Sequence, residues 1–300
     1  MALQSNGSIK LGKRVKRNRL SDLNYASRKR NHQTKYTMSE ALKVPTAAEF
    51  LAQGKQPEVL FWVGCSGSFD DRAKKITKAF VKLLNKAGVE FAVLGAEESC
   101  TGDPAKRAGN EFLFQMQAMM NIEVLNGYEI KKIVTACPHC FNTLKNEYPE
   151  LGGNYEVVHH TQFLKSLIAE SRLKIEGGKF KGKKITYHDP CYLGRANDEY
   201  EAPRELLEKL DAALLEMKRS KRNGLCCGAG GAQMFKEPEP GNKDINIERT
   251  EEALETGAEI IAAGCPFCNT MMTDGIKAAE KEGKVEVLDV AELIANAEDL

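Results

Sequence analysis

The stretch Cys265-Pro266-Phe267-Cys268, near the end of GAEIIAAGCPFCNT (257–270), has a close copy earlier in the chain. That copy is Cys137-Pro138-His139-Cys140, within KKIVTACPHCFNT (131–143). The sequence after each copy is also repeated, as YEVVHHTQFLKSLI (155–168) and VEVLDVAELIANA (285–297). In both places a short apolar run precedes the two cysteines, which is typical of a buried strand that ends in a turn. The repeat predicts two similar halves.

All nine cysteines belong to this repeat, and Cys65 lies as far from Cys100 as Cys191 lies from Cys226. Thiols that are far apart in sequence but stay in register are expected to converge in space. We therefore expect each half to fold its cysteines around one thiophilic centre. The two predicted ligand sets are Cys65, Cys100, Cys137 and Cys140 in the first half, and Cys191, Cys226, Cys227, Cys265 and Cys268 in the second.

Composition indicates a globular protein: 300 residues with 42% hydrophobic content can bury one large core or two smaller ones, and the repeat favours two. There is no apolar run of the ~18 residues that a membrane helix needs, and the start of the chain lacks an apolar signal-peptide core. We therefore expect a cytoplasmic protein whose thiols are reduced. In that compartment a set of regularly spaced cysteines favours metal or redox chemistry over structural disulfides.

The first 37 residues carry a net charge of +9, against −8 for the rest. We predict a disordered basic tail. This tail could be an arm that binds nucleic acid or anionic lipid. Alternatively, Met38 is the ordinary N-terminus and the residues before it are an over-long start of the sequence. We favour the second interpretation and expect no nucleic-acid partner. The predicted organisation is an N-terminal extension (1–56), a first domain (57–170), a Gly- and Lys-rich linker (171–184) and a second domain (185–300).

Strand-like and helix-like segments alternate along both halves, which predicts an α/β fold with parallel sheets. Every cysteine then falls at the carboxyl end of a strand, where such sheets bind ligands. We expect helices over 106–125 and 205–214. We also expect the apolar side chains of the first helix to pack in the core rather than to supply soft ligands; they are Phe112, Met116, Met119 and Met120.

Thiolates hold iron–sulfur clusters, and a Cys-x-x-Cys turn at a helix start supplies two of them. Pro138 and Pro266 suit the first turn of a helix, whose N-terminus favours a negatively charged group. Gly228, Gly230 and Gly231 would let the backbone approach closely and aim N–H groups at sulfur.

The second half resembles the CCG pattern, which occurs twice in the catalytic subunit of heterodisulfide reductases and in related iron–sulfur subunits of glycolate and lactate oxidation systems. The resemblance covers roughly residues 58 to 300. It implies that a complete motif binds a noncubane [4Fe-4S] centre through five cysteines, here Cys191, Cys226, Cys227, Cys265 and Cys268.

The first half departs from this pattern. A shift of 126 residues, which places Cys65 on Cys191 and Cys100 on Cys226, leaves Thr101 where the second adjacent cysteine would be. Four thiols are the complement of a cubane [4Fe-4S] cluster, so we expect a cubane or another four-thiolate centre there. The alternative is a degenerate site.

Other interpretations of the same residues stay open. Each Cys-x-x-Cys also resembles a thioredoxin-like dithiol turn, and two four-thiolate zinc sites could stabilise a scaffold without redox activity. His188 and Asp189, before Cys191, are candidates for a proton relay, although such a pair also commonly satisfies a turn. His139 could tune a cluster or face solvent, and we expect His159 and His160 to be structural.

The resemblance implies one subunit of a larger oxidoreductase, which relays electrons between a flavoprotein and a ferredoxin-domain subunit. In related systems that partner is sometimes membrane-bound and quinone-linked, so the chain could lie at the inner face of a membrane through it. The alternative is direct cleavage of a disulfide substrate at the second centre, which predicts a cleft beside Cys226 and Cys227.

Overall fold

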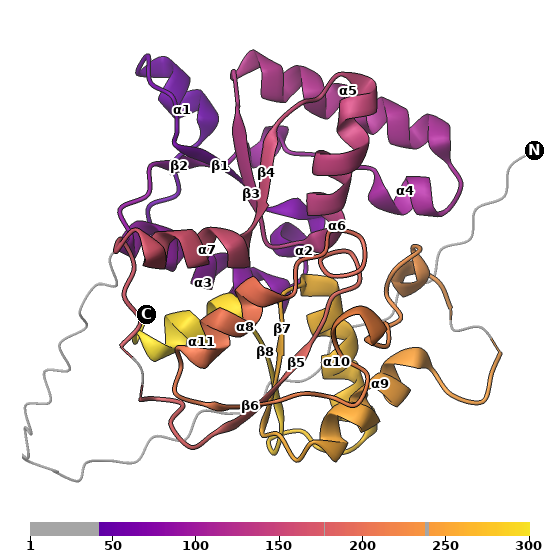
Figure 1. Ribbon diagram of the computed structural model, residues 1–300. Coiled ribbons are helices and arrows are strands. Elements are labelled where there is room, and N and C mark those ends of the chain that lie inside the picture. The colour runs from indigo at the N-terminus through magenta and orange to yellow at the C-terminus, as the bar shows by residue number, and fades with distance from the viewer. Residues whose placement is uncertain (1–41, 177, 238–239) are drawn as a thin grey trace, which may run out of the picture. The chain divides into compact units, whose positions relative to one another are not determined.

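The computed structural model describes residues 42–176, 178–237 and 240–300, which form two parallel four-stranded sheets flanked by helices (Figure 1). The first sheet has the order β2-β1-β3-β4 and the second β6-β5-β7-β8, so each half repeats one topology. The predicted α/β fold with two pseudo-repeated parallel sheets is confirmed. The strands are β1 Val59–Trp62, β2 Phe91–Ala92, β3 Lys132–Thr135, β4 Glu156–His159, β5 Lys184–His188, β6 Ala213–Leu215, β7 Ile260–Ala263 and β8 Glu286–Asp289.

The strand register brings the cysteine segments to one edge of each sheet. Trp62, the last residue of β1, pairs with Thr135 of β3, and His188, the last residue of β5, pairs with Ala263 of β7. Both partners lie two residues before a Cys-Pro-x-Cys turn. Parallel strands end at the same edge, so the segments after β1 and β3, and after β5 and β7, emerge side by side.

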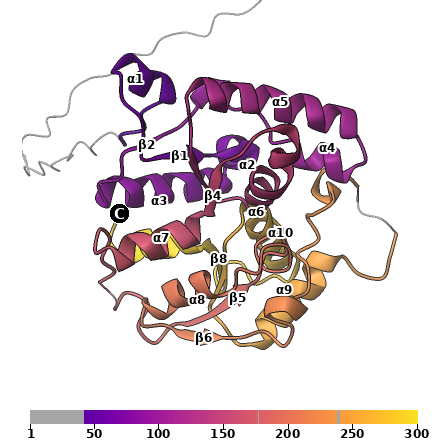
Figure 2. The same cartoon turned by 45° about the horizontal axis from the view of Figure 1, so that its top comes forward.

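The helices of the two halves meet between the two sheets. Figures 1 and 2 show α3 and α7 of the first half beside α8 and α11 of the second. The helices are α1 Ala47–Ala52, α2 Gly64–Phe69, α3 Ala73–Lys86, α4 Asp103–Arg107, α5 Glu111–Gly127, α6 Pro138–Asn142, α7 His160–Ala169, α8 Glu201–Glu208, α9 Ile245–Glu255, α10 Pro266–Ala278 and α11 Val290–Ala297.

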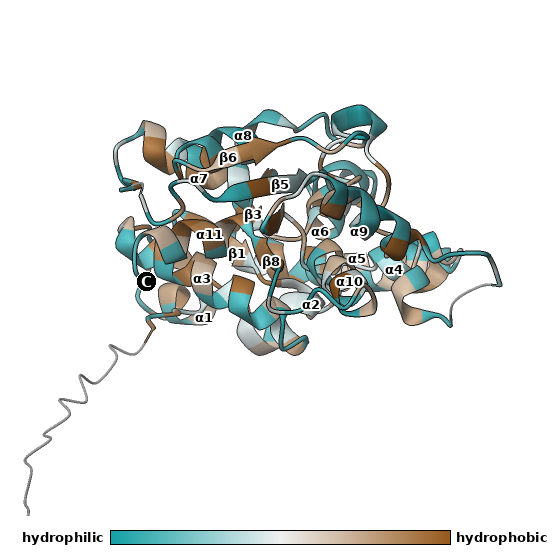
Figure 3. Ribbon diagram, turned by 90° about the horizontal axis from the view of Figure 1, so that it is seen from below, coloured by the Kyte–Doolittle hydropathy of each residue, from teal (hydrophilic) through white to brown (hydrophobic). Residues whose placement is uncertain are grey.

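One hydrophobic cluster belongs to both halves. It contains Phe61 and Phe80 of the first half together with Tyr187, Leu206 and residues of α11, all buried. In Figure 3 much of the strands and of α11 is coloured as hydrophobic, whereas α9 is largely hydrophilic. The expectation of two separate cores is therefore wrong, because the helices between the sheets bury their apolar faces against each other.

A buried polar network also joins the halves. His160 Nε2 lies 2.8 Å from Asp289 Oδ1, and His159 Nε2 lies 3.1 Å from the carbonyl of Gly264. The other ring nitrogen of His159, Nδ1, makes a hydrogen bond with the Thr161 hydroxyl at 2.7 Å. His159 and Asp289 begin the equivalent helices α7 and α11, so the structural role expected of the histidine pair is to fix this interface.

Two details differ from the sequence-based expectations, and a third lies outside the described residues. The helix predicted over 205–214 ends at Glu208, and Ala213–Leu215 instead forms the edge strand β6. Within the predicted extension 1–56, Thr46 and Glu49 form a capping box that begins α1, so this part is folded. The predicted basic tail lies in residues 1–41, outside the described residues.

The helix predicted over 106–125 is interrupted, because α4 ends at Arg107 and α5 begins at Glu111. Helix α5 also differs from its prediction in the face that it buries. Its side chains Phe112, Met119 and Met120 are 74%, 61% and 59% exposed, and Met116 is exposed too, so they do not pack in the core. Instead Phe114, Ala118, Ile122 and Leu125 face inward. Across the described residues, no helix is long and apolar enough to cross a membrane.

Candidate metal centres

The first pocket gathers four thiols from three strand ends. Cys65 lies in the first turn of α2, directly after β1, and its thiol adjoins that of Cys100, which comes from the loop after β2. The thiols of Cys137 and Cys140, at the start of α6, adjoin each other. A Cβ at Gly64 would lie 3.4 Å from the Sγ of Cys140, so α2 approaches the Cys-Pro-His-Cys turn closely. The structure thus brings the four predicted residues of the first half together.

The second pocket gathers five. The thiols adjoin one another in a series, Cys191 beside Cys226, Cys226 beside Cys227, Cys227 beside Cys268 and Cys268 beside Cys265. All nine cysteines lie in the described part of the chain and carry free thiols. The spacing seen in the sequence therefore corresponds to two separate clusters of sulfur side chains.

A glycine turn holds the central thiol of each pocket. The Gly102 N–H donates to Cys100 Sγ at 3.5 Å, and the Gly228 N–H donates to Cys226 Sγ at 3.3 Å. The two glycines have φ of +88° and +89°, a left-handed conformation that other residues adopt only with strain. Of the three glycines singled out in the sequence, Gly228 directs its N–H at a cysteine sulfur. A role of Gly228, Gly230 and Gly231 in holding a cofactor stays a prediction.

The thiols strongly perturb each other's acidity. The neighbouring thiol of Cys65 lowers the pKa of Cys100 to about 7, and that of Cys140 lowers the pKa of Cys137 to about 7. Neighbouring cysteine thiols, followed by burial, hold the pKa of Cys140 and of Cys268 well above its usual value. Several thiolates cannot share such a pocket unless a cationic centre compensates their charge.

The two pockets differ at one position. Thr101 is buried, and its hydroxyl lies 3.9 Å from the Sγ of Cys140. In the second half Cys227 makes the corresponding contact, with Cys268. Thr101 therefore stands where the comparison of the two halves placed it, in the position of the fifth thiol.

His139 lies between the two pockets. Its ring centroid is 5.1 Å from that of Phe267, the x residue of the second Cys-Pro-x-Cys turn, and 4.6 Å from that of Tyr192. His139 Nδ1 lies 2.9 Å from Asp103 Oδ2. Burial alone would lower the pKa of His139, but Asp103 and nearby cysteine sulfurs raise it to about 9. His139 is buried, so it does not face solvent.

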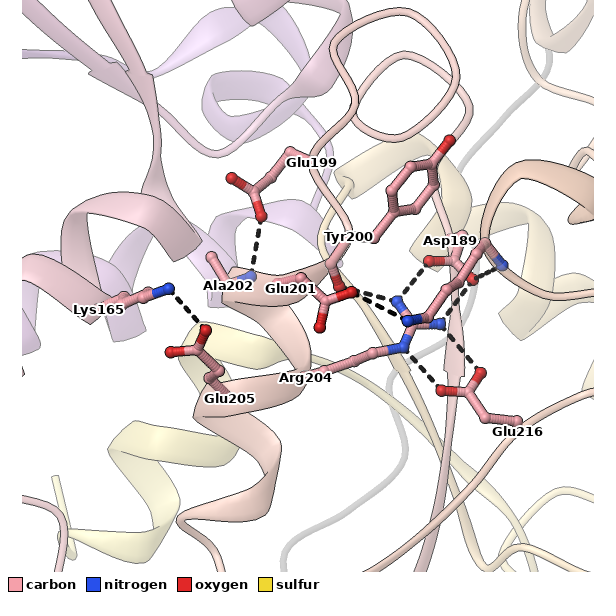
Figure 4. Close-up of polar contacts among 10 residues, drawn as sticks. Lys165, Asp189, Glu199, Tyr200, Glu201, Ala202, Arg204, Glu205 and Glu216 are labelled. Carbon is pink, nitrogen blue, oxygen red and sulfur yellow. Dashed lines mark hydrogen bonds and ion pairs between the residues drawn. The ribbon is translucent and has the colours of Figure 1, made fainter.

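His188 and Asp189, the candidates for a proton relay, have separate partners. Asp189 binds the Arg204 guanidinium through both oxygens, at 2.8 and 2.9 Å, and accepts the Lys221 N–H at 2.7 Å (Figure 4). His188 Nδ1 accepts a hydrogen bond from Arg249 Nε at 3.0 Å. Asp189 thus fixes the turn before Cys191 against α8.

The pockets fit an iron–sulfur group chemically. Their donors are soft thiolates, in sets of four and five, and a fifth thiol exceeds what tetrahedral zinc requires. Around the second pocket several buried polar atoms lack a protein partner among the described residues, including His188 Nε2 and both side-chain polar atoms of Asn269. Buried polar groups are normally satisfied, so these atoms indicate that a polar group belongs beside them.

Several supporting residues were not found from the sequence. Glu98 accepts the N–H groups of Val63 and Gly64 at 3.0 and 2.6 Å and so ties the Cys100 loop to α2. Burial raises the pKa of Glu98 to about 7. Asp103, Arg204 and Arg249 were missed as well. The signal available for Asp103 was its place directly after the glycine turn, in Cys-Thr-Gly-Asp-Pro.

The cysteine-rich domain family, CCG, matches residues 59–145 and 185–273, so each match covers one of the two repeated halves. The chain belongs to the CCG family. As a CCG protein it is 49% identical over 250 residues to the EtfAB:quinone oxidoreductase of Syntrophomonas wolfei, with 81% of this chain and 35% of that protein covered.

Two further relatives are similar to this CCG protein. The probable iron-sulfur-binding oxidoreductase FadF of Bacillus subtilis is 48% identical, over 85% of this chain and 36% of FadF. One subunit of the dihydromethanophenazine:CoB--CoM heterodisulfide reductase of Methanosarcina barkeri is 37% identical, over 80% of this chain and 59% of that subunit. The chain thus spans little more than a third of the first two relatives.

Proposed function

We propose that this chain is an iron–sulfur electron-transfer subunit of a larger oxidoreductase. The gathering of nine free thiols into two pockets supports this most directly. Cys65, Cys100, Cys137 and Cys140 would hold a four-thiolate [4Fe-4S] cluster, and the five cysteines of the second half a noncubane [4Fe-4S] cluster. Such clusters supply one-electron redox chemistry at potentials that the protein sets through hydrogen bonds, charge and burial.

The contact between the two Cys-Pro-x-Cys turns supports transfer within the chain. His139 and Phe267 are each flanked by two proposed ligands, and their rings are in edge contact. The two proposed centres therefore adjoin each other across the interface between the halves, and the protein buries the region between them.

Names of the relatives suggest the partners. One is an EtfAB:quinone oxidoreductase and one belongs to a heterodisulfide reductase. For this chain we propose a flavoprotein electron donor and an acceptor that is a ferredoxin-domain or quinone-linked subunit. Association with a membrane, at its cytoplasmic face, would then come through that partner.

A direct test uses anaerobically purified chain and a photoreduced electron-transferring flavoprotein. Stopped-flow mixing should bleach the visible absorbance of the clusters as the flavin reoxidises. The same chain with Cys65→Ser and Cys191→Ser should show no bleaching. Reduction by dithionite without any reduction by the flavoprotein would count against the proposed donor.

A second candidate function is reductive cleavage of a disulfide at the second centre. A cavity of about 470 Å³ lies beside the loop that follows Cys227, and its lining includes Gly228, Met234, Ile245 and Met271. It lies next to the position expected for the cleft, but its lining includes neither Cys226 nor Cys227. Cleavage would consume two electrons and two protons and release two thiols.

Turnover of a small asymmetric disulfide, with reduced methyl viologen as electron source, tests this candidate. Release of two thiols per two viologens oxidised would support it. If the flavoprotein reduces the chain but no disulfide is cleaved, the chain acts as a relay.

A further inference from the structure

His188 ends strand β5 three residues before Cys191, and its side chain is fully buried. One ring nitrogen of His188 and the Sγ atoms of Cys227 and Cys268 all lie within 4.8 Å of one another. The imidazole therefore forms part of the wall of the second pocket and is not a surface turn residue.

Arg249 determines which nitrogen of His188 carries the proton. The guanidinium has only donors, so His188 Nδ1, 3.0 Å from Arg249 Nε, must be the acceptor. Arg249 is itself fixed, because its Nη1 donates to the Arg219 carbonyl at 2.8 Å and to Glu252 at 3.0 Å. A neutral imidazole in this arrangement carries its hydrogen on Nε2.

The resulting Nε2–H has no acceptor within the described parts of the chain, although it is buried. A buried donor without an acceptor is costly, so such an atom indicates a missing partner. Because Nδ1 is occupied by Arg249, Nε2 is the nitrogen available to the pocket.

We propose that His188 donates a hydrogen bond from Nε2 to a sulfur atom of the second centre and raises its reduction potential. The proposal rests on the iron–sulfur function proposed above. A hydrogen bond to sulfur becomes stronger as negative charge accumulates there, so it favours the reduced state over the oxidised state. His188 is thus a positioning and tuning residue with a fixed proton, and this role needs no proton exchange.

The first half carries a comparable group. Trp62 ends β1 at the position equivalent to His188, is fully buried, and its indole Nε1 likewise lacks a partner in the described residues. An indole nitrogen can only donate. Both halves therefore place an unpaired N–H donor at the end of the same strand, which is expected if each serves a centre that accepts hydrogen bonds.

Two matched variants separate the two ring nitrogens. His188→Asn keeps an acceptor near the Nδ1 position, for Arg249, and loses the Nε2–H. His188→Gln keeps an N–H near the Nε2 position and loses the acceptor. Anaerobic redox titration followed by EPR measures the midpoint potential of each centre, and the first centre serves as an internal reference.

We expect His188→Asn to raise the ratio of oxidised to reduced second centre roughly tenfold at a fixed potential, which corresponds to a midpoint lower by about 59 mV for a one-electron couple. His188→Gln should stay close to wild type. Equal midpoints in wild type and His188→Asn, with iron and sulfide retained, would overturn this inference alone. Wild-type protein without iron and sulfide would overturn the proposed function, and the inference with it.

A second measurement leaves His188 in place. His139→Phe removes the imidazole that contacts Phe267 in the second Cys-Pro-x-Cys turn. Labelled with ¹⁵N-histidine, this variant should still show a ¹⁵N coupling at the EPR signal of the reduced second centre, as expected for an imidazole hydrogen-bonded to it. A second-centre signal free of histidine coupling would contradict the proposal even if the His188 variants failed to fold.

Discussion

The hydroxyl of Thr101 lies 3.9 Å from the Sγ of Cys140, and Cys227 makes the equivalent contact with Cys268 in the second half. The turns that carry these residues are also alike, since Gly102 and Gly228 donate to the preceding cysteine sulfur with nearly equal φ. The first pocket therefore has the backbone of a five-thiol site and the side chains of a four-thiol site.

This relationship predicts the outcome of Thr101→Cys. Because the backbone is already in place and the residue is buried at 2% exposure, the new thiol should lie where Cys227 lies in the second pocket. We expect the EPR signal of the first centre to change toward that of the second. Thr101→Ser, which keeps the hydroxyl, should leave the signal as in wild type. A first-centre signal unaffected by Thr101→Cys would show that the fifth position does not determine the type of centre.

The buried Asp189–Arg204 ion pair predicts that the substitution Asp189→Asn makes the folded protein less stable. Both side chains are at most 5% exposed, so Asp189→Asn would remove the buried carboxylate and leave the more exposed Glu216 to pair with Arg204 (Figure 4). Breaking a buried ion pair typically costs ~3 kcal/mol or more. We expect Asp189→Asn to unfold at a lower urea concentration than wild type under anaerobic conditions. We also expect the turn that positions Cys191 to be less firmly fixed.

The matched control for Asp189→Asn lies on the same helix as Arg204. Glu205 pairs with Lys165 at 2.6 Å, but both are more than 40% exposed. Glu205→Gln should change the free energy of unfolding by less than ~1 kcal/mol. Equal effects of the two substitutions would contradict a special role for Asp189.

The buried position of His159 predicts that the free energy of unfolding falls in mild acid. Burial, followed by the neighbouring His160, holds the pKa of His159 well below its ordinary value of 6.5. The unfolded chain gains this proton below about pH 6.5 while the folded chain does not, so His159 lowers stability by ~1.4 kcal/mol per pH unit below that value.

The substitution His159→Asn tests this. Asparagine can begin α7, as Asp289 begins α11, so the variant should fold but should be less stable at pH 7.5 through loss of the contact with Gly264. Its stability should decline less steeply than that of wild type between pH 6.5 and 5.5, as measured by thermal unfolding under anaerobic conditions. Parallel pH profiles for the two proteins would rule out a buried neutral His159.

The thiol arrangement could be predicted from the sequence because it depends on local patterns. Short apolar runs before Cys137 and Cys265 indicate strands, and parallel strands end at one edge, so cysteines at strand ends must approach each other. Comparison of the halves also located Thr101 correctly.

Other features depend on contacts that no local pattern encodes. The Nε2–H of His188 is set by Arg249, 61 residues away, and the environment of His139 by Asp103, 36 residues away. Strand β6 was missed because it has only three residues and follows a helical pattern. The exposed face of α5 was missed because its apolar residues surround the helix, so periodicity did not distinguish the buried side.

Metal and sulfide analysis of the anaerobically purified chain tests the central claim most directly. Two [4Fe-4S] centres predict about eight iron atoms and about eight acid-labile sulfides per chain, with almost no zinc. About two zinc atoms per chain and no sulfide would contradict the account and would indicate a thiolate scaffold without redox activity.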